Sequence, residues 1–260
     1  MDDDGTPAAC YEVPRAKALP DGTTHRACTL ADAKKLKLLG SFTTAWRIRA
    51  NPGLDKWKQG NAIMAALTSP MREPYEKGII SEDAFLESVL TDAEAEGKGA
   101  ADTGTEIHAA IEQALLGESF DERWGVHVAH TLDALSQLAP LGQWRGEIVF
   151  ARPELGYGGK IDAAAPLWLV DFKTLKPWDK PPRAYDSWAP QLAAYAQGLD
   201  RMYGSSGQWA NICISRGEDA AVHIIHYTDA ERAAAFEEWK LTRRLWLHTS
   251  GLGAVLGVHQ

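Results

Sequence analysis

Apolar residues in the first half of the chain recur every three or four positions, which is the spacing of amphipathic helices. Residues 1–25 lack this spacing, contain three prolines and are expected to be extended or mobile. Asn51 and Ser81 suit helix starts, and Gly117 suits a helix end. The pattern predicts helices at about residues 30–39, 52–67, 81–89, 103–116 and 122–138.

Short apolar runs bounded by turn residues replace the helical spacing in the second half of the chain. A helix that starts near Ser187 or Pro190 is expected between the third and fourth of these runs. Thr228 and Glu231 form a capping box for a last helix, which continues to about Leu247. The order of helices, three strands, helix, two strands and helix is that of an α/β protein. The strands are predicted at about residues 147–151, 158–164, 169–173, 209–214 and 221–227.

The length and composition are those of an ordinary globular protein. A chain of 260 residues can bury a full core as one domain, or as one domain with a modest N-terminal addition. No apolar run approaches the roughly 18 residues that span a bilayer. The acidic start resembles no signal peptide. We therefore expect no membrane partner and a cytoplasmic location.

The three cysteines are Cys10, Cys28 and Cys213, which are widely spaced and form no C-x-x-C pair. They support no disulfide framework and favour a reducing compartment. An iron–sulfur cluster usually requires four thiolates, so we expect no cluster held by this chain alone.

Charge is distributed unevenly along the chain, although the formal net charge is −8. Residues 26–58 contain eight basic and two acidic side chains, and residues 82–122 are predominantly acidic. A local basic segment is typical of a surface that binds a polyanion such as nucleic acid. Two solvated helical faces of opposite sign would give the same pattern.

The candidate chemistry lies in residues 156–176. Side chains alternate along a strand, so Asp171 and Lys173 are expected on one face. If Ala165–Trp168 forms the hairpin loop, Asp162 lies directly opposite Asp171, whereas a tighter loop would shift this register. Two neighbouring carboxylates raise each other's pKa unless a cation lies between them. Mg²⁺ or Mn²⁺ suits such oxygen ligands, and a nearby lysine can position water or stabilise charge on a phosphate.

These residues resemble the motifs of the PD-(D/E)XK nucleases, particularly the RecB-like and phage-type exonuclease branch. Gly159–Asp162 is similar to the G-x-x-D motif, and Asp171–Lys173 is similar to the D/E-x-K motif. Gln191 and Tyr195 match the Q-x-x-x-Y motif, and Gly104–His108 matches the G-x-x-x-H motif. The matches occur in the family's order from about residue 104 to residue 214.

The resemblance implies a restriction-endonuclease-like αβββαβ core, with a mixed central sheet flanked by helices. Residues 1–100 would form a helical, partly basic N-terminal region, and residues 101–260 would form the nuclease core with a C-terminal helix. The implied activity is metal-dependent DNA exonuclease action, in which a metal-activated water hydrolyses phosphodiester bonds. The implied partners are DNA with a free end or single-stranded region and a recombination or repair partner, such as a single-strand annealing protein.

The resemblance also implies roles for individual residues. Mg²⁺ or Mn²⁺ would be held by four groups, namely the side chains of His108, Asp162 and Asp171 and the carbonyl of Phe172. The catalytic residues would be Asp162, Asp171, Lys173, Gln191 and Tyr195. Glu112 and Glu147 are supporting candidates; a structural salt bridge explains Glu112 equally well, and an exposed strand edge is the alternative for Glu147. For His108, the alternative is a structural role in the core or at the surface. For Tyr195, the alternative is packing of its helix on the sheet.

Two further segments are candidates for DNA contact. Residues 41–44 and 52–57 are similar to the S-x-T-T and P-x-L-x-x-W patterns of phage-type and mitochondrial genome-maintenance exonucleases. A proline-rich loop with aromatic and basic side chains follows the D-x-K strand, and it could bind unpaired bases or be a packed surface loop. The candidates are Ser41, Thr43, Thr44, Arg47, Lys56, Trp57, Trp178 and Arg183, with Trp188 and Lys180 beside them in the loop.

Three other functions remain open at this point. A structure-specific endonuclease could use the same site, and a catalytically silent module could bind DNA without hydrolysing it. A metal hydrolase with a different substrate is disfavoured by the basic segment.

Overall fold

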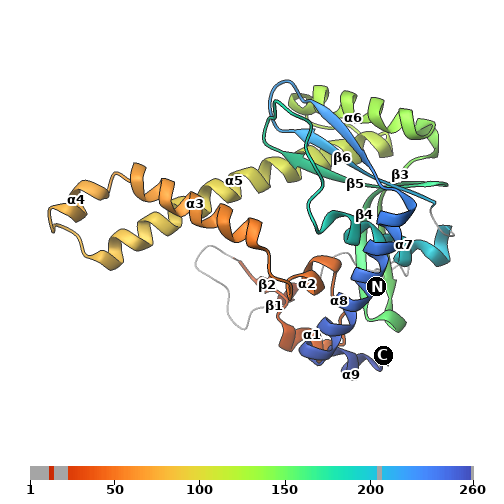
Figure 1. Cartoon of the computed structure of the whole chain (residues 1–260), viewed down its shortest axis with the longest axis horizontal. Helices are drawn as coiled ribbons and strands as arrows, with labels where there is room; N and C mark the ends of the chain where they lie inside the picture. Colours follow the sequence, from red (N-terminus) through yellow and green to blue (C-terminus); the bar gives the residue numbers. More distant parts are fainter. Residues whose placement is uncertain (1–11, 15–22, 204–206, 259–260) are drawn as a thin grey trace. The chain divides into compact units, whose positions relative to one another are not determined.

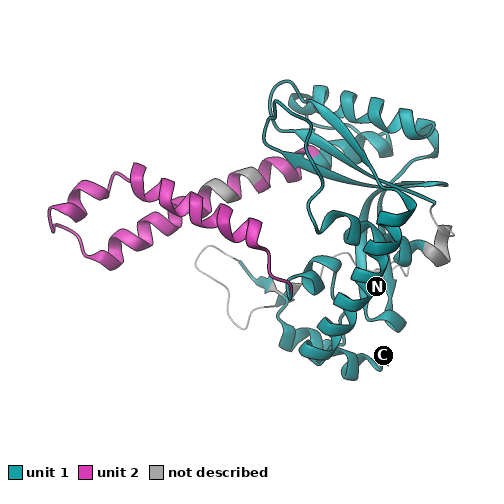
Figure 2. Cartoon of the chain, in the orientation of Figure 1, with its two compact units in different colours: residues 1–48, 108–260 teal, residues 49–107 magenta. Residues whose placement is uncertain are grey.

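The computed structural model describes residues 12–14, 23–203 and 207–258 (Figure 1). The chain divides into two compact units, which consist of residues 1–48 with 108–260 and of residues 49–107 (Figure 2). These boundaries differ from the predicted division at residue 100. Helix α2 (Phe42–Trp46) belongs with the second half of the chain, because it packs against β4, α7 and α8. Cys10 lies outside the described residues.

The larger unit is built on a five-stranded mixed sheet in the order β3-β4-β5-β6-β7. Strands β5 and β6 are parallel, and the other neighbours are antiparallel. All five predicted strands are present, and most extend by one or two residues beyond the predicted ends. Their bounds are Arg145–Arg152 (β3), Tyr157–Ala165 (β4), Trp168–Leu175 (β5), Gln208–Ser215 (β6) and Val222–His226 (β7).

Helices cover both faces of this sheet. Helix α6 (Gly125–Leu138) packs against β6 and β7, and Figure 1 shows it on the side of the sheet opposite α7 (Trp188–Tyr203). Helix α7 contacts β3, β4 and β5 and also packs against α8 (Asp229–Ser250). The predicted α/β class and flanked mixed sheet are therefore confirmed. A short helix α9 (Leu252–Leu256) follows α8, and single helical turns lie at Glu122–Trp124, Leu141–Gln143 and Pro153–Leu155.

The N-terminal elements of the larger unit are short. Strands β1 (Glu12–Pro14) and β2 (His25–Ala27) pair antiparallel in a segment for which no strand was predicted. Helix α1 (Leu30–Leu36) ends earlier than predicted, because Lys37 adopts a left-handed conformation with φ 55°. The N–H of Lys37 then bonds to the carbonyl of Ala33 and closes the last turn.

The smaller unit is helical. Helix α3 (Pro52–Thr68) begins at the predicted cap, where the Asn51 side chain accepts a hydrogen bond from the Leu54 N–H. Helix α4 (Arg72–Glu76) follows, and α5 runs without interruption over Glu82–Leu116, so that its end lies in the larger unit. The prediction of two separate helices here was wrong. The intervening residues contain no proline, and each glycine costs a helix only about 1 kcal/mol relative to alanine. None of the described helices could cross a membrane.

The core between the sheet and α7 is tightly packed around one aromatic ring. Phe150 on β3 is 3% exposed, and its ring meets those of Tyr157 and Tyr195 at T-shaped angles. Gly198 on α7 lies against the same ring, so that a Cβ atom at this position would overlap three of its carbons. Any larger residue at position 198 would therefore displace the aromatic cluster.

Replacing Gly198 with alanine is expected to lower the free energy of unfolding by about 1–3 kcal/mol, because the buried ring has no space to move into. Gly60→Ala on α3 is the matched control, since no heavy atom lies within 4 Å of its added Cβ. That change should leave stability unchanged or raise it by about 1 kcal/mol. Urea unfolding of both variants measures the difference, and equal stability of the Gly198→Ala variant and the unaltered protein would contradict the packing account.

Candidate active site

A row of polar side chains crosses the sheet where its backbone pairing is interrupted. Strands β4 and β5 pair from Ala165↔Trp168 to Ala163↔Val170. The next positions in this register are Asp162 and Asp171, as predicted for a hairpin loop at Ala165–Trp168. On the far side of β5, Asp171 pairs with Asn211 on β6. The sheet therefore brings two carboxylates and an amide into line across three strands.

Asp162 replaces a backbone acceptor at this interruption. Its Oδ2 atom accepts a hydrogen bond from the backbone N–H of Phe172 at 2.7 Å. The Nδ1 atom of His108, on the C-terminal part of α5, lies 3.8 Å from the same oxygen. The His108 ring also meets the Phe172 ring edge-on, with the ring centres 5.9 Å apart. Asp162 thus links the G-x-x-x-H helix to the D-x-K strand.

Asp171 is the buried centre of the site. The residue is 3% exposed, and both oxygens of its carboxylate accept hydrogen bonds. Oδ1 accepts from Gln191 Nε2 at 2.9 Å, and Oδ2 accepts from Asn211 Nδ2 at 2.8 Å. The ammonium group of Lys173 completes the arrangement at 2.7 Å from Oδ2. A carboxylate buried this deeply requires such donors to offset its lost hydration.

Gln191 on α7 connects the ion pair to the helix. Its Oε1 atom accepts a hydrogen bond from Lys173 Nζ at 2.8 Å, and its Nε2 group donates to the Tyr195 hydroxyl at 2.7 Å. The four-residue spacing puts Gln191 and Tyr195 on one helical face, as the motif requires. The structure therefore brings together Asp162, Asp171, Lys173, Gln191, Tyr195 and His108.

Asn211 and Tyr227 belong to the same network, although sequence reasoning missed both. Asn211 is fully buried and also donates to the Asp171 backbone carbonyl at 3.1 Å. Its Oδ1 atom accepts a hydrogen bond from the Tyr227 hydroxyl at 2.6 Å. The available signal was a single amide within the otherwise apolar strand W-A-N-I-C-I. A buried polar residue in such a strand indicates a hydrogen-bonded partner.

Burial dominates the electrostatics of the site. It raises the pKa of Asp171 to about 6; Asp162 also raises this pKa, and Lys173 opposes the shift. Burial lowers the pKa of His108, which favours the neutral imidazole that binds metals. The pKa of the Tyr195 hydroxyl is raised by burial and by Asp171, so this group remains a neutral hydrogen-bonding partner.

The two supporting glutamates lie beside Lys160. Glu147 occupies the interruption between β3 and β4, has a φ of 47° and forms an ion pair with Lys160. The pKa of Glu112 is raised chiefly by its partial burial, with an opposing effect from Lys160 and a further increase from Asp162. This ion pair was not among the roles considered for Glu147, whose alternative was an exposed strand edge.

The donor groups suit a divalent cation, but their present arrangement is closed, because the Lys173 ammonium group already contacts the Asp171 carboxylate. Carboxylate oxygens, a backbone carbonyl and a neutral imidazole are ligands of Mg²⁺, Mn²⁺ and similar ions. Within the described residues, however, no three His, Cys, Asp or Glu side chains form a group able to hold a metal. Lys173 contacts the oxygen of Asp171 that a cation would otherwise neutralise. A cation bound between Asp162 and Asp171 would therefore compete with Lys173 for the Asp171 carboxylate.

The N-terminal DNA-contact candidates are distributed over both units. In the larger unit, the Ser41 hydroxyl caps α2 by accepting from the Thr44 N–H at 3.2 Å, and the side chains of Thr43 and Arg47 are exposed. In the smaller unit, Lys56 is exposed on α3 and Trp57 is 48% exposed.

After β5, Trp188 takes the packed alternative that the sequence left open. It is the first residue of α7, is buried and lies at a tilted angle to Tyr185, and Lys173 Nζ lies 5.8 Å from the centre of its ring. It therefore supports the lysine and is not available to stack on a base. Trp178 is half-buried and Arg183 is exposed, so both are accessible from this loop.

Comparisons with known proteins add little to this geometry. No family model matches the sequence, and no curated protein matches it. Among solved structures, a crystal structure described as "Putative exonuclease" from Eubacterium rectale aligns at 13% identity with a TM-score of 0.41. The alignment covers 57% of this chain and 68% of that chain. A likeness this distant establishes neither a family nor an activity.

The Asp171 carboxyl is expected to titrate near pH 6 in the metal-free protein, because burial disfavours its charged form. Between the ordinary value of 3.8 and about 6, the folded state binds more protons than the unfolded state. This group therefore makes stability fall as the pH rises through that window. In a Lys173→Ala variant the pKa should rise further, since a favourable cation is lost. Carboxyl ¹³C NMR measures both values, and a titration near pH 4 or a lower pKa in the variant would contradict the account.

Proposed function

We propose that this protein is a divalent-metal-dependent deoxyribonuclease that hydrolyses DNA from an end. The observation that carries the proposal is the meeting of Asp162, Asp171 and Lys173 across two neighbouring strands, with Gln191 and Tyr195 bonded to them from α7. These residues come from two strands and the following helix, and they match a nuclease motif order. Their convergence on one buried carboxylate is the arrangement that the motifs require.

Mg²⁺ or Mn²⁺ would be held by Asp162, Asp171, the Phe172 carbonyl and His108, and when bound would supply Lewis-acid activation of water and of the phosphate. The protein side chains have separate tasks. Lys173, once moved from Asp171, can donate a hydrogen bond to the attacking water or to a phosphate oxygen. Gln191 and Asn211 hold the Asp171 carboxylate in place, and Tyr195 fixes the amide of Gln191.

DNA is the substrate favoured by the exposed cations and aromatics. Arg47, Lys56 and Trp57 can contact phosphates and bases, and Arg183 lies in the loop that directly follows the D-x-K strand. A free end or single-stranded region suits stacking on exposed aromatics better than an intact duplex does. We extend the proposal to action beside a recombination or repair partner, such as a single-strand annealing protein.

A second candidate is a DNA-binding module that does not hydrolyse its substrate. It is favoured by the closed arrangement, in which Lys173 contacts Asp171 and the described residues form no three-ligand metal group. The two candidates differ in their response to metal. Only the nuclease requires Asp162 and Asp171 to bind a cation.

Lys173→Ala is expected to reduce the rate of linear DNA digestion by at least about a hundredfold, because it removes the donor beside the reacting phosphate. Lys240→Ala is a control, since this lysine lies on α8 and pairs with Glu237. Release of nucleotides from end-labelled linear DNA measures the effect in Mg²⁺ or Mn²⁺, and a chelator should abolish it. Equal digestion by the Lys173→Ala variant would exclude the mechanism, and digestion of closed circles would indicate an endonuclease.

Isothermal titration with Mn²⁺ is expected to show a saturable site that is lost in Asp162→Asn and Asp171→Asn variants, because each removes a charged oxygen ligand. Glu154→Gln is the control, since Glu154 lies on the helical turn Pro153–Leu155 and its carboxylate pairs with Arg152 at the end of β3. Unchanged Mn²⁺ affinity in both aspartate variants would leave the silent DNA-binding module as the better description.

A further inference from the structure

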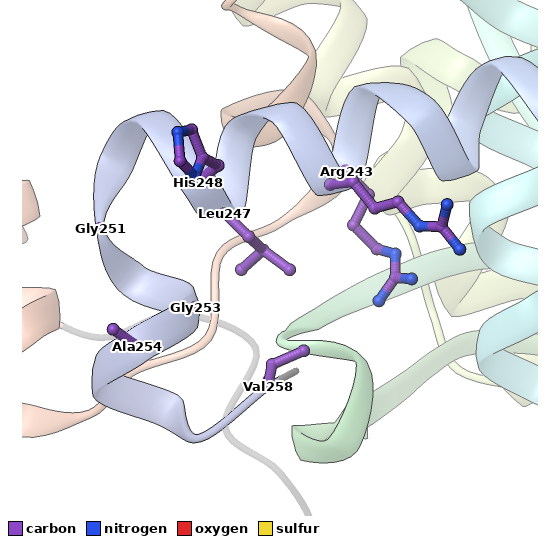
Figure 3. Close-up of a pocket in the computed structure, with 8 residues that line it drawn as sticks. Arg243, Leu247, His248, Gly251, Gly253, Ala254 and Val258 are labelled. Carbon is purple, nitrogen blue, oxygen red and sulfur yellow. The ribbon is translucent and has the colours of Figure 1, made fainter. Parts of the chain in front are cut away.

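A cavity separate from the candidate active site lies at the C-terminal corner of the larger unit. It has a volume of about 320 Å³ and is formed by the end of α8 together with α9 (Figure 3). Its lining combines two arginines and a histidine with an apolar wall, namely Arg243, Arg244 and His248 with Leu247, Ala254 and Val258. A volume of this size is at the lower end of pockets that hold small organic ligands.

Arg243 is the unusual member of this lining. The residue is only 8% exposed, and its Nη1 group donates a hydrogen bond to the Leu155 carbonyl at 2.6 Å. Its Nε atom is buried and has no hydrogen-bond partner among the described residues. Burial lowers the pKa of this guanidinium, and the neighbouring Arg244 lowers it further. A buried cation normally requires an anionic partner, because the lost hydration is otherwise uncompensated.

Among the residues that the structure describes, the surroundings of the cavity supply more positive charge and no carboxylate that pairs with Arg243. Arg244 and His248 are exposed on the same helix and line the same space. The Lys34 ammonium on α1 lies 3.3 Å from where a Cβ of Gly251 would stand, and Gly251 also lines the cavity. Glu154, the acidic side chain next to Leu155, is paired with Arg152. Hydrogen-bond donors therefore surround the cavity. No carboxylate among the described residues pairs with Arg243.

We infer that this cavity binds a small organic phosphate. A phosphate monoester carries about −1.5 to −2 charges and three terminal oxygens, which suits several donors around one point better than a single carboxylate does. Guanidinium groups match phosphate geometry particularly well. Leu247, Ala254 and Val258 provide an apolar surface for the organic part of the ligand. None of the cavity's residues contributes to the Asp171 network, so the inference stands independently of nuclease activity.

Isothermal titration of the full chain in EDTA tests this site with four probes: inorganic phosphate, adenosine 5′-monophosphate, adenosine and acetate. The phosphate group should be required, and the monophosphate should bind about tenfold more tightly than inorganic phosphate, because it also buries apolar surface. Equal binding of adenosine would overturn the inference, as would equal binding of acetate. Absence of binding by either phosphate at millimolar concentration would overturn it too.

Substitutions assign the binding to this cavity. An Arg244→Ala/His248→Ala double variant should weaken monophosphate binding by at least about tenfold, because a guanidinium and an imidazole donor are lost, and both residues are exposed enough for the fold to persist. Lys35→Ala is the matched control on α1, since Lys35 is exposed and does not line the cavity. Asp171→Asn should bind the monophosphate normally. Unchanged affinity in the double variant, or loss in Asp171→Asn alone, would show that the phosphate binds elsewhere.

Discussion

The buried carboxylate of Asp171 is the interaction on which the candidate site depends. A charge at 3% exposure is stable only when donors surround it, and strands β5 and β6 together with α7 each supply one. This requirement fixes the rotamers of Lys173, Gln191 and Asn211, and through Gln191 also the position of Tyr195. Removing any of these donors leaves part of the carboxylate unpaired, so the network acts as a unit.

The ion pair between Lys173 and Asp171 distinguishes the present arrangement from a metal-bound one. Lys173 neutralises Asp171 in the place where a divalent cation would do so. A cation that binds Asp162 and Asp171 would release the ammonium group toward the substrate, which is where a hydrolytic mechanism uses it. Burial and Asp162 raise the pKa of Asp171, and Lys173 offsets this shift only in part.

Sequence alone predicted the features that follow from short-range rules. The strand alternation placed Asp171 and Lys173 on one face, and the hairpin length placed Asp162 opposite Asp171. The capping box at Thr228 and the cap at Asn51 were also predicted correctly. Long-range contacts could not be predicted from the sequence. The return of α2 to the second half and the burial of Trp188 depend on tertiary packing. Asn211 became recognisable as part of the site only once β6 was paired with β5.

A crystal structure of the protein soaked in Mn²⁺, with anomalous scattering used to locate the metal, tests the central claim most directly. The account predicts a manganese peak bonded to carboxylate oxygens of Asp162 and Asp171, with the Lys173 ammonium displaced from Asp171. A structure without that peak, in which Lys173 still contacts the Asp171 carboxylate at saturating manganese, would contradict it.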